Sequence, residues 1–275
     1  MKILISIDRS SQGKAAVILG TKIAEALSAS VKLMVAGKKQ DKVNKAAETA
    51  HSILKSSNVA FDSVIRFGPY VDSLQVEIED KCFDLVVVGY RKRKPIERAL
   101  TRCIASRLAH DVATSVLIVR SERSKIRKLL LGISGNGFTD ELISWGTSIA
   151  NTFNSKVTLV HVESAPPLMF AGLEEVEQTL EELLSTHTPT SAALQKAARA
   201  MQESGIETDL KIAYGVAHRE LLRTAQEEDH DLIVMGSSWA RPSFDRIILS
   251  NVTRDLLHHT KRSVLVVYPS TPQTA

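Results

Sequence analysis

Short apolar runs, each separated from the next by a longer amphipathic stretch, follow one another along the whole chain. Residues 3–7, 31–35 and 85–88 are almost continuously apolar and rich in β-branched side chains. Strands with this pattern are buried on both faces, as in a parallel sheet that is covered by helices. The runs therefore predict buried strands rather than half-exposed ones.

The stretches between the runs carry apolar side chains at helical spacing. One such set follows Ser10 and Ser11, either of which is a suitable N-cap; its members are Ala15, Ile18, Leu19, Ile23 and Leu27. A similar set lies in the second half of the chain: Leu142, Trp145, Ile149 and Phe153. Alternation of strand and helix predicts a doubly wound α/β fold. Ligands in such folds bind beyond the carboxyl ends of the strands.

The pattern occurs twice. Residues 84–89 match residues 231–236 at an offset of 147 (231 minus 84), and residues 3–8 match residues 129–134 at an offset of 126 (129 minus 3). Five strand-like segments recur in one order, which indicates an internal duplication. In numbers, the segments of the first copy are 3–8, 31–35, 64–68, 84–89 and 116–119.

The duplication predicts two domains, at residues 1–122 and 126–270, joined by a charged linker near 121–127. The change of offset, 21 residues (147 minus 126), places an insert in the second copy around residues 163–192. The insert contains Pro166-Pro167 and a polar stretch, residues 173–184, that predicts a helix.

Composition narrows the class of protein. The 275 residues carry a net charge of +4 and two cysteines, Cys82 and Cys103. Two cysteines are too few for a disulfide scaffold, and no apolar run reaches the roughly 18 residues of a membrane helix. The N-terminal run breaks at Asp8 and resembles a strand rather than a signal peptide. We therefore expect a cytoplasmic protein, and the small, dispersed charge favours neither nucleic acid nor a membrane as partner.

The order of the motifs resembles the universal stress protein family. The first copy has Ile7-Asp8-Arg9-Ser10, then Asp84-Leu85-Val86-Val87-Val88-Gly89, then Ser115-Val116-Leu117-Ile118-Val119. The second has Asp231-Leu232-Ile233-Val234-Met235-Gly236-Ser237-Ser238, Asn251-Val252-Thr253 and Ser263-Val264-Leu265-Val266-Val267. The resemblance implies the tandem, two-domain form. Each domain is then a five-stranded parallel sheet of order 3-2-1-4-5, like the adenine nucleotide alpha hydrolases.

The resemblance also implies a nucleotide loop, G-x2-G-x9-G-S/T, after the fourth strand, and an acid after the first. Glycines let the main chain wrap closely round phosphates, and the following helix N-terminus attracts them. In the first copy, Asp8 supplies the acid and Gly89 the first glycine. Lys92, Arg102 and Cys103 replace the remaining loop positions.

The loop of the second copy is one residue longer and is also altered. Gly236 stands at its start, Trp239 replaces the second glycine, and Ser250 and Asn251 replace the Gly-Ser pair. Ser134 stands in place of the acid. His161, at the end of the second strand, faces the expected cleft, although a solvent-facing histidine is the simpler interpretation. The candidate nucleotide-binding residues are Asp8, Ser10, Val35, Gly89, Lys92, Arg102, Cys103, His161, Gly236, Ser237, Ser250 and Asn251.

Two functions remain in competition, together with a less favoured nucleotide-handling enzyme of related fold. The first is a non-catalytic stress-response or regulatory protein with degenerate nucleotide loops, working through protein partners that the sequence does not name. The second is a protein that binds ATP or AMP through Asp8 and the basic loop after Gly89, where side-chain cations replace the lost main-chain cradle. The sequence has no nucleophile elbow, intact P-loop or metal-spaced His/Cys set, so we expect no enzyme and no metal.

The last strands, residues 115–119 and 263–267, are apolar throughout. An exposed strand edge of this kind invites pairing with another strand. We expect the two strands to pair antiparallel within one chain and so to join the two domains. Further assembly into a homodimer stays open, with the insert at residues 163–192 as one candidate surface.

Overall fold

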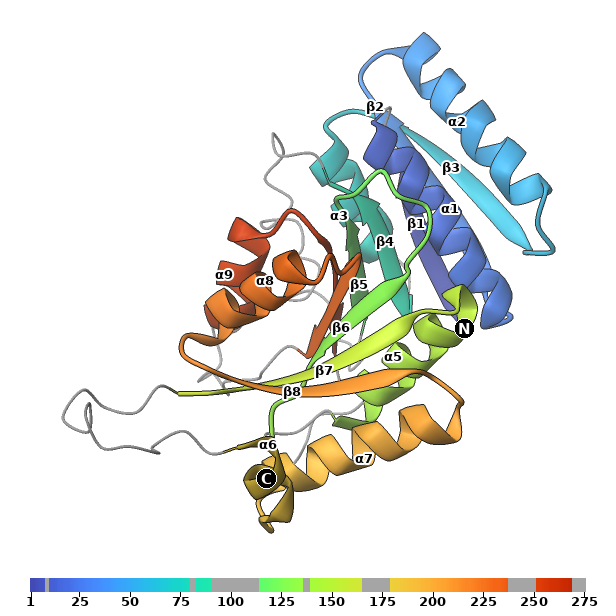
Figure 1. Ribbon diagram of the computed structural model, residues 1–275. Helices are drawn as coiled ribbons and strands as arrows, with labels where there is room; N and C mark the ends of the chain where they lie inside the picture. The colour runs from blue at the N-terminus through green and yellow to red at the C-terminus, as the bar shows by residue number, and fades with distance from the viewer. Residues whose placement is uncertain are drawn as a thin grey trace. The chain divides into compact units, whose positions relative to one another are not determined.

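The computed structural model describes residues 1–7, 10–79, 83–90, 114–135, 139–164, 179–236 and 251–268. Their contacts divide them into two compact units. Within the described ranges, the first unit holds residues 1–125 and 261–268, and the second holds residues 126–236 and 251–260. Each unit is an α/β structure in which helices cover a mostly parallel sheet (Figure 1).

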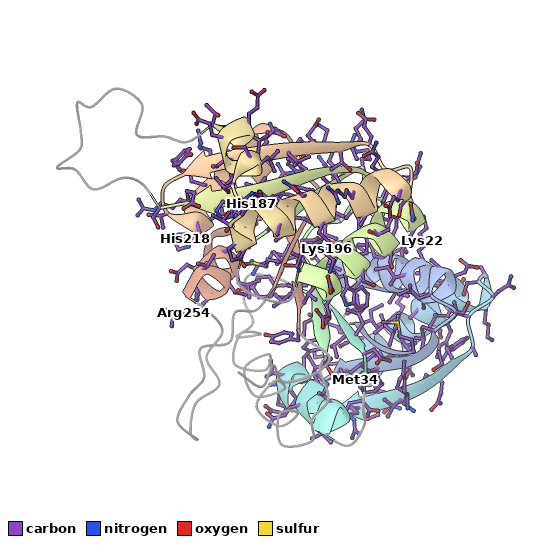
Figure 2. The ribbon with its side chains drawn as sticks, turned by 90° about the horizontal axis from the view of Figure 1, so that it is seen from below. Lys22, Met34, His187, Lys196, His218 and Arg254 are labelled. Carbon is purple, nitrogen blue, oxygen red and sulfur yellow. The ribbon has the colours of Figure 1, made fainter. Side chains whose placement is uncertain are left out.

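The first unit is built on parallel strands in the predicted order, β3-β2-β1-β4-β5. The central strands are buried on both faces, as their unbroken apolar sequences predict; Leu4, Leu33 and Val87, for example, have no exposed surface. Met34 on β2 is buried as well (Figure 2). The strands are β1 (Lys2–Ile7), β2 (Ser30–Gly37), β3 (Phe61–Phe67), β4 (Leu85–Gly89) and β5 (Ser115–Val119).

Three described helices pack on this sheet. The helix α1 (Ser11–Ala26) begins after Ser10, whose side chain accepts a hydrogen bond from Gly13 N, so the predicted N-cap is confirmed. The helix α2 (Gln40–Lys55) contacts β2 and β3, and α3 (Tyr70–Glu79) contacts β2. Arg66 of β3 pairs with Glu77 of α3, whereas Phe61 of β3 contacts His51 of α2. Phe61 and Arg66 are an odd number of residues apart on β3, so their side chains point to opposite faces of the sheet. The helices that they contact, α2 and α3, therefore lie on opposite faces.

The second unit repeats the arrangement. Its parallel strands run in the order β8-β7-β6-β9, and α5 contacts α7 while α8 contacts α9 (Figure 1). The strands are β6 (Lys128–Gly132), β7 (Lys156–Glu163), β8 (Thr208–Tyr214) and β9 (Leu232–Gly236). The helices are α5 (Thr139–Phe153), α6 (Leu180–Ser185), α7 (Pro189–Glu203), α8 (Ala217–Glu227) and α9 (Asn251–His259).

The fifth strand of the second repeat, β10 (Ser263–Val267), belongs to the first compact unit. It pairs antiparallel with β5, with Leu265 opposite Leu117. Ser263 Oγ accepts a hydrogen bond from Arg120 N at 3.2 Å, and Ser115 Oγ accepts one from Tyr268 N at 3.4 Å. The sheet of this unit is therefore not wholly parallel, because its last strand is antiparallel. The domain boundaries inferred from the repeat stay a prediction.

One turn recurs at the offset of 147. Gly68 follows β3 with a φ angle of 156°, and Gly215 follows β8 with a φ angle of 138°. Residues that carry a side chain rarely adopt such angles. In the insert of the second copy, Thr179 is the extended N-cap of α6 (Leu180–Ser185), so the prediction of one unbroken helix over residues 173–184 is wrong at this residue. The earlier part of the predicted helix, residues 173–178, lies outside the described residues. No helix in the described ranges is long and apolar enough to cross a membrane.

A buried histidine precedes β9. His230 is almost fully buried, and its Nε2 lies 2.9 Å from Thr158 Oγ1 on β7. Burial lowers the pKa of His230 below its ordinary value of 6.5, since the interior penalises the imidazolium; nearby Glu228 acts in the opposite direction. Folding thus favours the neutral form of this ring.

This burial predicts a pH dependence. With a lowered folded pKa, the unfolded chain takes up the proton first, so the stabilisation is complete above about pH 6.5 and falls as the pH decreases toward the folded pKa. For one group the slope is at most about 1.4 kcal/mol per pH unit. Urea unfolding of the wild type and His230→Gln should therefore show a free-energy difference that shifts in favour of the variant in acid. His187→Gln, at an exposed residue, is the control (Figure 2); parallel curves for wild type and His230→Gln would contradict the prediction.

A second prediction concerns the β5–β10 pair. Leu265 has no exposed surface, so Leu265→Asp buries a charge without a partner at a cost of about 3–5 kcal/mol. We expect a lower melting temperature and, because the pair joins the last strands of the two repeats, a larger radius of gyration in small-angle X-ray scattering. Leu265→Val is the matched control, and an unchanged radius for Leu265→Asp would rule out this role.

Candidate functional site

The carboxyl ends of β1, β2 and β4 form the predicted binding edge of the first unit. Val35 lies on β2 between Ile7 and Ile65 and has no exposed surface, so its side chain belongs to the core. Ser10 Oγ accepts a hydrogen bond from Gly13 N at 3.0 Å. Both candidate residues therefore already have structural roles. Asp8 lies outside the described residues.

Gly89 ends β4 opposite Val119 of β5. A Cβ atom at this position would lie 2.5 Å from Gly13 N and 2.6 Å from Gly13 Cα, in the first turn of α1. Atoms of the main chain cannot move aside as the tip of a side chain can. The close approach of β4 to α1 thus explains why this position is glycine without any phosphate. The other candidates of this loop, Lys92, Arg102 and Cys103, lie outside the described residues.

A pocket of about 380 Å³ opens at the same edge of the sheet, where β2 leads into α2 and β3 leads into α3. Its floor includes Tyr70, which is buried and whose hydroxyl accepts a hydrogen bond from Ser6 Oγ at 2.5 Å. Three exposed lysines surround it; they are Lys38, Lys39 and Lys42. We call this feature the lysine pocket.

The lysine pocket is strongly cationic. No ion pair recorded among the described residues involves its three lysines; the lysine pairs lie at Lys32, Lys156, Lys196 and Lys211. The first turns of α2 and α3 also line it, and their main-chain N–H groups add partial positive charge. Together the groups favour an anion at the carboxyl edge of the sheet. The sequence interpretation missed this pocket, although three lysines within five residues after an apolar run were a visible signal.

Among the described residues of the second unit, no equivalent cluster of lysines follows the second strand. At the offset of 126, Gly37 corresponds to Glu163 and Lys38 to Ser164. His161 lies beside this acid and is 7% exposed, so the expectation that it faces solvent is wrong. Its Nδ1 lies 2.9 Å from Ile133 O and its Nε2 lies 3.0 Å from Glu163 Oε1. Because both partners are acceptors, the two hydrogen bonds form together only when both ring nitrogens carry protons.

The remaining candidates of the second unit are placed only in part. Gly236 ends β9 and is half-buried. Asn251 is the first residue of α9. Ser237 and Ser250 lie outside the described residues. Their arrangement as one site therefore stays a prediction.

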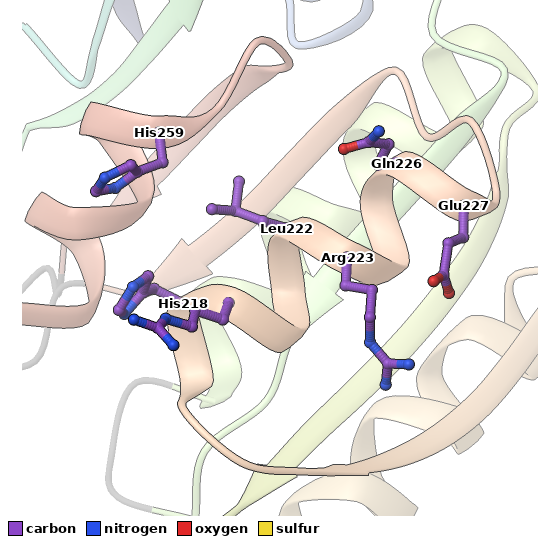
Figure 3. Close-up of a pocket in the computed structure, with 7 residues that line it drawn as sticks. His218, Leu222, Arg223, Gln226, Glu227 and His259 are labelled. Carbon is purple, nitrogen blue, oxygen red and sulfur yellow. The ribbon is translucent and has the colours of Figure 1, made fainter.

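A second hollow, of about 600 Å³, lies between α8 and α9 (Figure 3). The rings of His218 and His259 stack across it with centroids 6.0 Å apart. Arg223 donates two hydrogen bonds to Glu220 Oε2, which raises the pKa of this arginine. Charges of both signs line the groove, and no group of three His, Cys, Asp or Glu suited to a metal ion occurs in the described ranges. The groove thus lacks the single sign of charge found in the lysine pocket.

The comparison with protein families now adds to this geometry. The model of the universal stress protein family matches residues 1–120 and again residues 125–268. The chain belongs to the universal stress protein family. Universal stress protein MJ0531 of Methanocaldococcus jannaschii is 25% identical over 150 residues, which is 54% of this chain and 86% of that protein.

Solved structures resemble this fold over almost the whole length of the chain. A universal stress protein from Archaeoglobus fulgidus has a TM-score of 0.63 at 14% identity and covers 97% of this chain and 98% of its own. Protein PA1789 from Pseudomonas aeruginosa, described as functionally unknown, has a TM-score of 0.64 at 19% identity. The match covers 98% of this chain and 92% of that protein's chain. At these identities the likeness shows the fold alone. An Archaeoglobus fulgidus universal stress protein in complex with dAMP covers 51% of this chain and 97% of its own, at 14% identity and a TM-score of 0.38, which is too weak to assign a ligand.

The contact at Gly89 generates a prediction. Gly89→Ala should lower the free energy of unfolding by about 1–3 kcal/mol, because the new methyl group meets the main chain of α1. In Gly132→Ala, at the end of β6, the nearest atom is a leucine methyl at 3.5 Å, so this control should cost less than about 1 kcal/mol. Urea unfolding measures both. Equal stability of Gly89→Ala and the wild type would show that packing does not require this glycine.

Proposed function

We propose that this chain is a non-catalytic stress-response protein whose first domain binds an anionic ligand of the adenine nucleotide class in the lysine pocket. The observation that carries the proposal is the concentration of Lys38, Lys39 and Lys42 round a pocket at the carboxyl edge of the sheet. This is the edge at which doubly wound folds bind ligands. Membership of the family makes a nucleotide the first anion to test.

The positive charge of the lysine pocket lies on side chains rather than on a main-chain loop, which supports weak binding of the nucleotide. A tight triphosphate site needs main-chain N–H groups close to the phosphates, which requires small residues in the loop. Lys92, Arg102, Trp239 and Ser250 stand at those positions in the sequence. Flexible lysines are strongly hydrated point charges and lose side-chain entropy when they bind. We therefore expect reversible binding that follows nucleotide concentration.

The proposed function includes no catalysed reaction. The described residues of the lysine pocket supply cations, apolar contacts and one buried tyrosine that is hydrogen-bonded to Ser6. They supply no carboxylate or imidazole to activate a water molecule. We infer that the bound ligand acts as a signal, because its binding changes the contacts of this chain with partner proteins.

The pocket predicts the outcome of a binding experiment with ATP, AMP, inorganic phosphate and adenosine. A ligand at ten times its Kd stabilises the native state by about 1.4 kcal/mol, so millimolar ATP and AMP should raise the melting temperature, whereas adenosine should not. Lys39→Gln/Lys42→Gln should weaken ATP binding at least about tenfold in calorimetry, because two cations are lost. Lys45→Gln/Lys55→Gln, which removes the same charge elsewhere on α2, is the matched control.

The second candidate function uses the same ligand at different residues. If ATP or AMP is held by Asp8 and the basic loop after Gly89, Asp8→Ala and Lys92→Gln should abolish binding, and Lys39→Gln/Lys42→Gln should leave it unchanged. That result would replace the lysine pocket as the site. Absence of any nucleotide effect at millimolar concentration would contradict both sites, and steady release of phosphate from ATP would contradict the non-catalytic role.

A further inference from the structure

The strand β3 ends the sheet of the first unit, and its outer edge has no strand neighbour among the described residues. Two of its side chains are exposed although they are large and apolar: Ile65 is 43% exposed and Phe67 is 57% exposed. They point to the same face, since they are two residues apart on a strand. An apolar edge strand of this kind is a template for pairing with another chain unless charge or cover prevents it.

The hydrogen bonds to β2 show which main-chain groups of β3 point outward. Val31 N donates to Ala60 O at 2.9 Å, and Gly68 N donates to Gly37 O at 3.1 Å. In the parallel register these bonds direct the N–H groups of the even-numbered residues of β3 toward β2. The odd-numbered residues therefore face outward with their N–H and C=O groups; they are Phe61, Ser63, Ile65 and Phe67.

The sequence of β3 is complementary to itself when it is reversed about Val64. In an antiparallel pair centred on this residue, Asp62 of one chain lies opposite Arg66 of the other, and Phe61 lies opposite Phe67. The outward-facing residues 61 and 67, and 63 and 65, fall opposite each other, so their main-chain groups can exchange hydrogen bonds. Asp62 and Arg66 then occupy non-hydrogen-bonded pairs, in which opposite side chains are closest.

The local ion pairs are compatible with this arrangement. Asp62 pairs with Lys32, and its side chain is 74% exposed, so an oxygen remains accessible on the outer side. Asp62 Oδ1 accepts a hydrogen bond from the outward-pointing Ser63 N at 2.7 Å, and this local bond gives way when Ser63 N donates to Ile65 O of the second copy. Arg66 is anchored by Glu77, and its side chain is 31% exposed. Each charge can therefore serve two partners, one within the chain and one across the edge.

The corresponding edge strand of the second repeat, β8, has a residue that opposes self-pairing. At the offset of 147, Val64 corresponds to Lys211 at the centre of β8. Lys211 pairs with Glu228, and the same antiparallel pairing of β8 would place two Lys211 side chains opposite each other. A lysine at the centre of an edge strand is a common protection against association. The first repeat lacks this protection and has the self-complementary charges instead.

We propose that a second copy of this chain occupies the edge of β3, so that two first units join through an antiparallel β3–β3 pair centred on Val64. The interface buries Ile65 and Phe67 of both chains and repeats each contact about a two-fold axis, as an isologous interface does. This surface is distinct from the insert at residues 163–192, and the proposal does not depend on any ligand.

The test is sedimentation equilibrium of the full chain over a wide range of concentration. The wild type should form a dimer. Val64→Lys copies the residue of the second repeat and should raise the dimer Kd at least about 100-fold, because two ammonium groups oppose each other at the axis. Val64→Thr, which keeps a β-branched and uncharged side chain, should retain the dimer. A monomer at every concentration, or a dimer that Val64→Lys leaves intact, would overturn the proposal.

Two further variants keep the test decisive if Val64→Lys folds poorly. Asp62→Asn should raise the dimer Kd, because it removes the negative charge that lies opposite Arg66 of the second copy. In a chain with Cys82→Ser and Cys103→Ser, Val64→Cys should give a disulfide-linked dimer with oxidised glutathione, since the two side chains meet at the axis. Lys211→Cys is the matched control and should stay unlinked. Equal cross-linking at both positions, or at neither, would contradict the β3–β3 pair.

Discussion

Burial of the central strands on both faces is the constraint on which the rest of this molecule depends. A strand without an exposed face carries apolar side chains throughout. Polar residues are therefore confined to two places, the loops beyond the strand ends and the outermost strands of the sheet. The lysine pocket occupies the first place, at the ends of β2 and β3. The self-complementary edge of β3 occupies the second. The proposed ligand pocket and the proposed dimer edge thus both lie where the buried core leaves room for polar residues.

The two repeats share one fold but differ in their polar residues. Both have the same order for their first four strands, and both turn after the third strand at a glycine with positive φ. They differ where polar residues are permitted. The first has cations at the end of β2, whereas the second has Glu163 hydrogen-bonded to His161; the first has Val64 at the centre of its edge, whereas the second has Lys211. Duplication preserved the buried pattern and allowed the exposed positions to diverge.

Much of the fold was accessible from the sequence, because the periodicity of apolar residues reports burial directly. The Ser10 cap and the α5 pattern followed from it, whereas the strand order of the first unit was implied by the resemblance to the universal stress protein family. The site was less accessible. Gly89 was predicted only as part of a nucleotide loop, since nothing local in the sequence shows that Gly13 of α1 packs against it. His161 was expected at the surface, yet Ile133 O and Glu163 hold it inside. The lysine pocket needs two strand ends and two helix starts to meet, which is a property of the topology and not of one segment.

The position of the nucleotide phosphate in a crystal structure of the full chain with AMP tests this account most directly. We expect one AMP molecule per chain, in the first unit, with its phosphate within ion-pair distance of Lys38, Lys39 or Lys42. Nucleotide in both repeats, with phosphates bound by the main-chain nitrogens that follow Gly89 and Gly236, would contradict it.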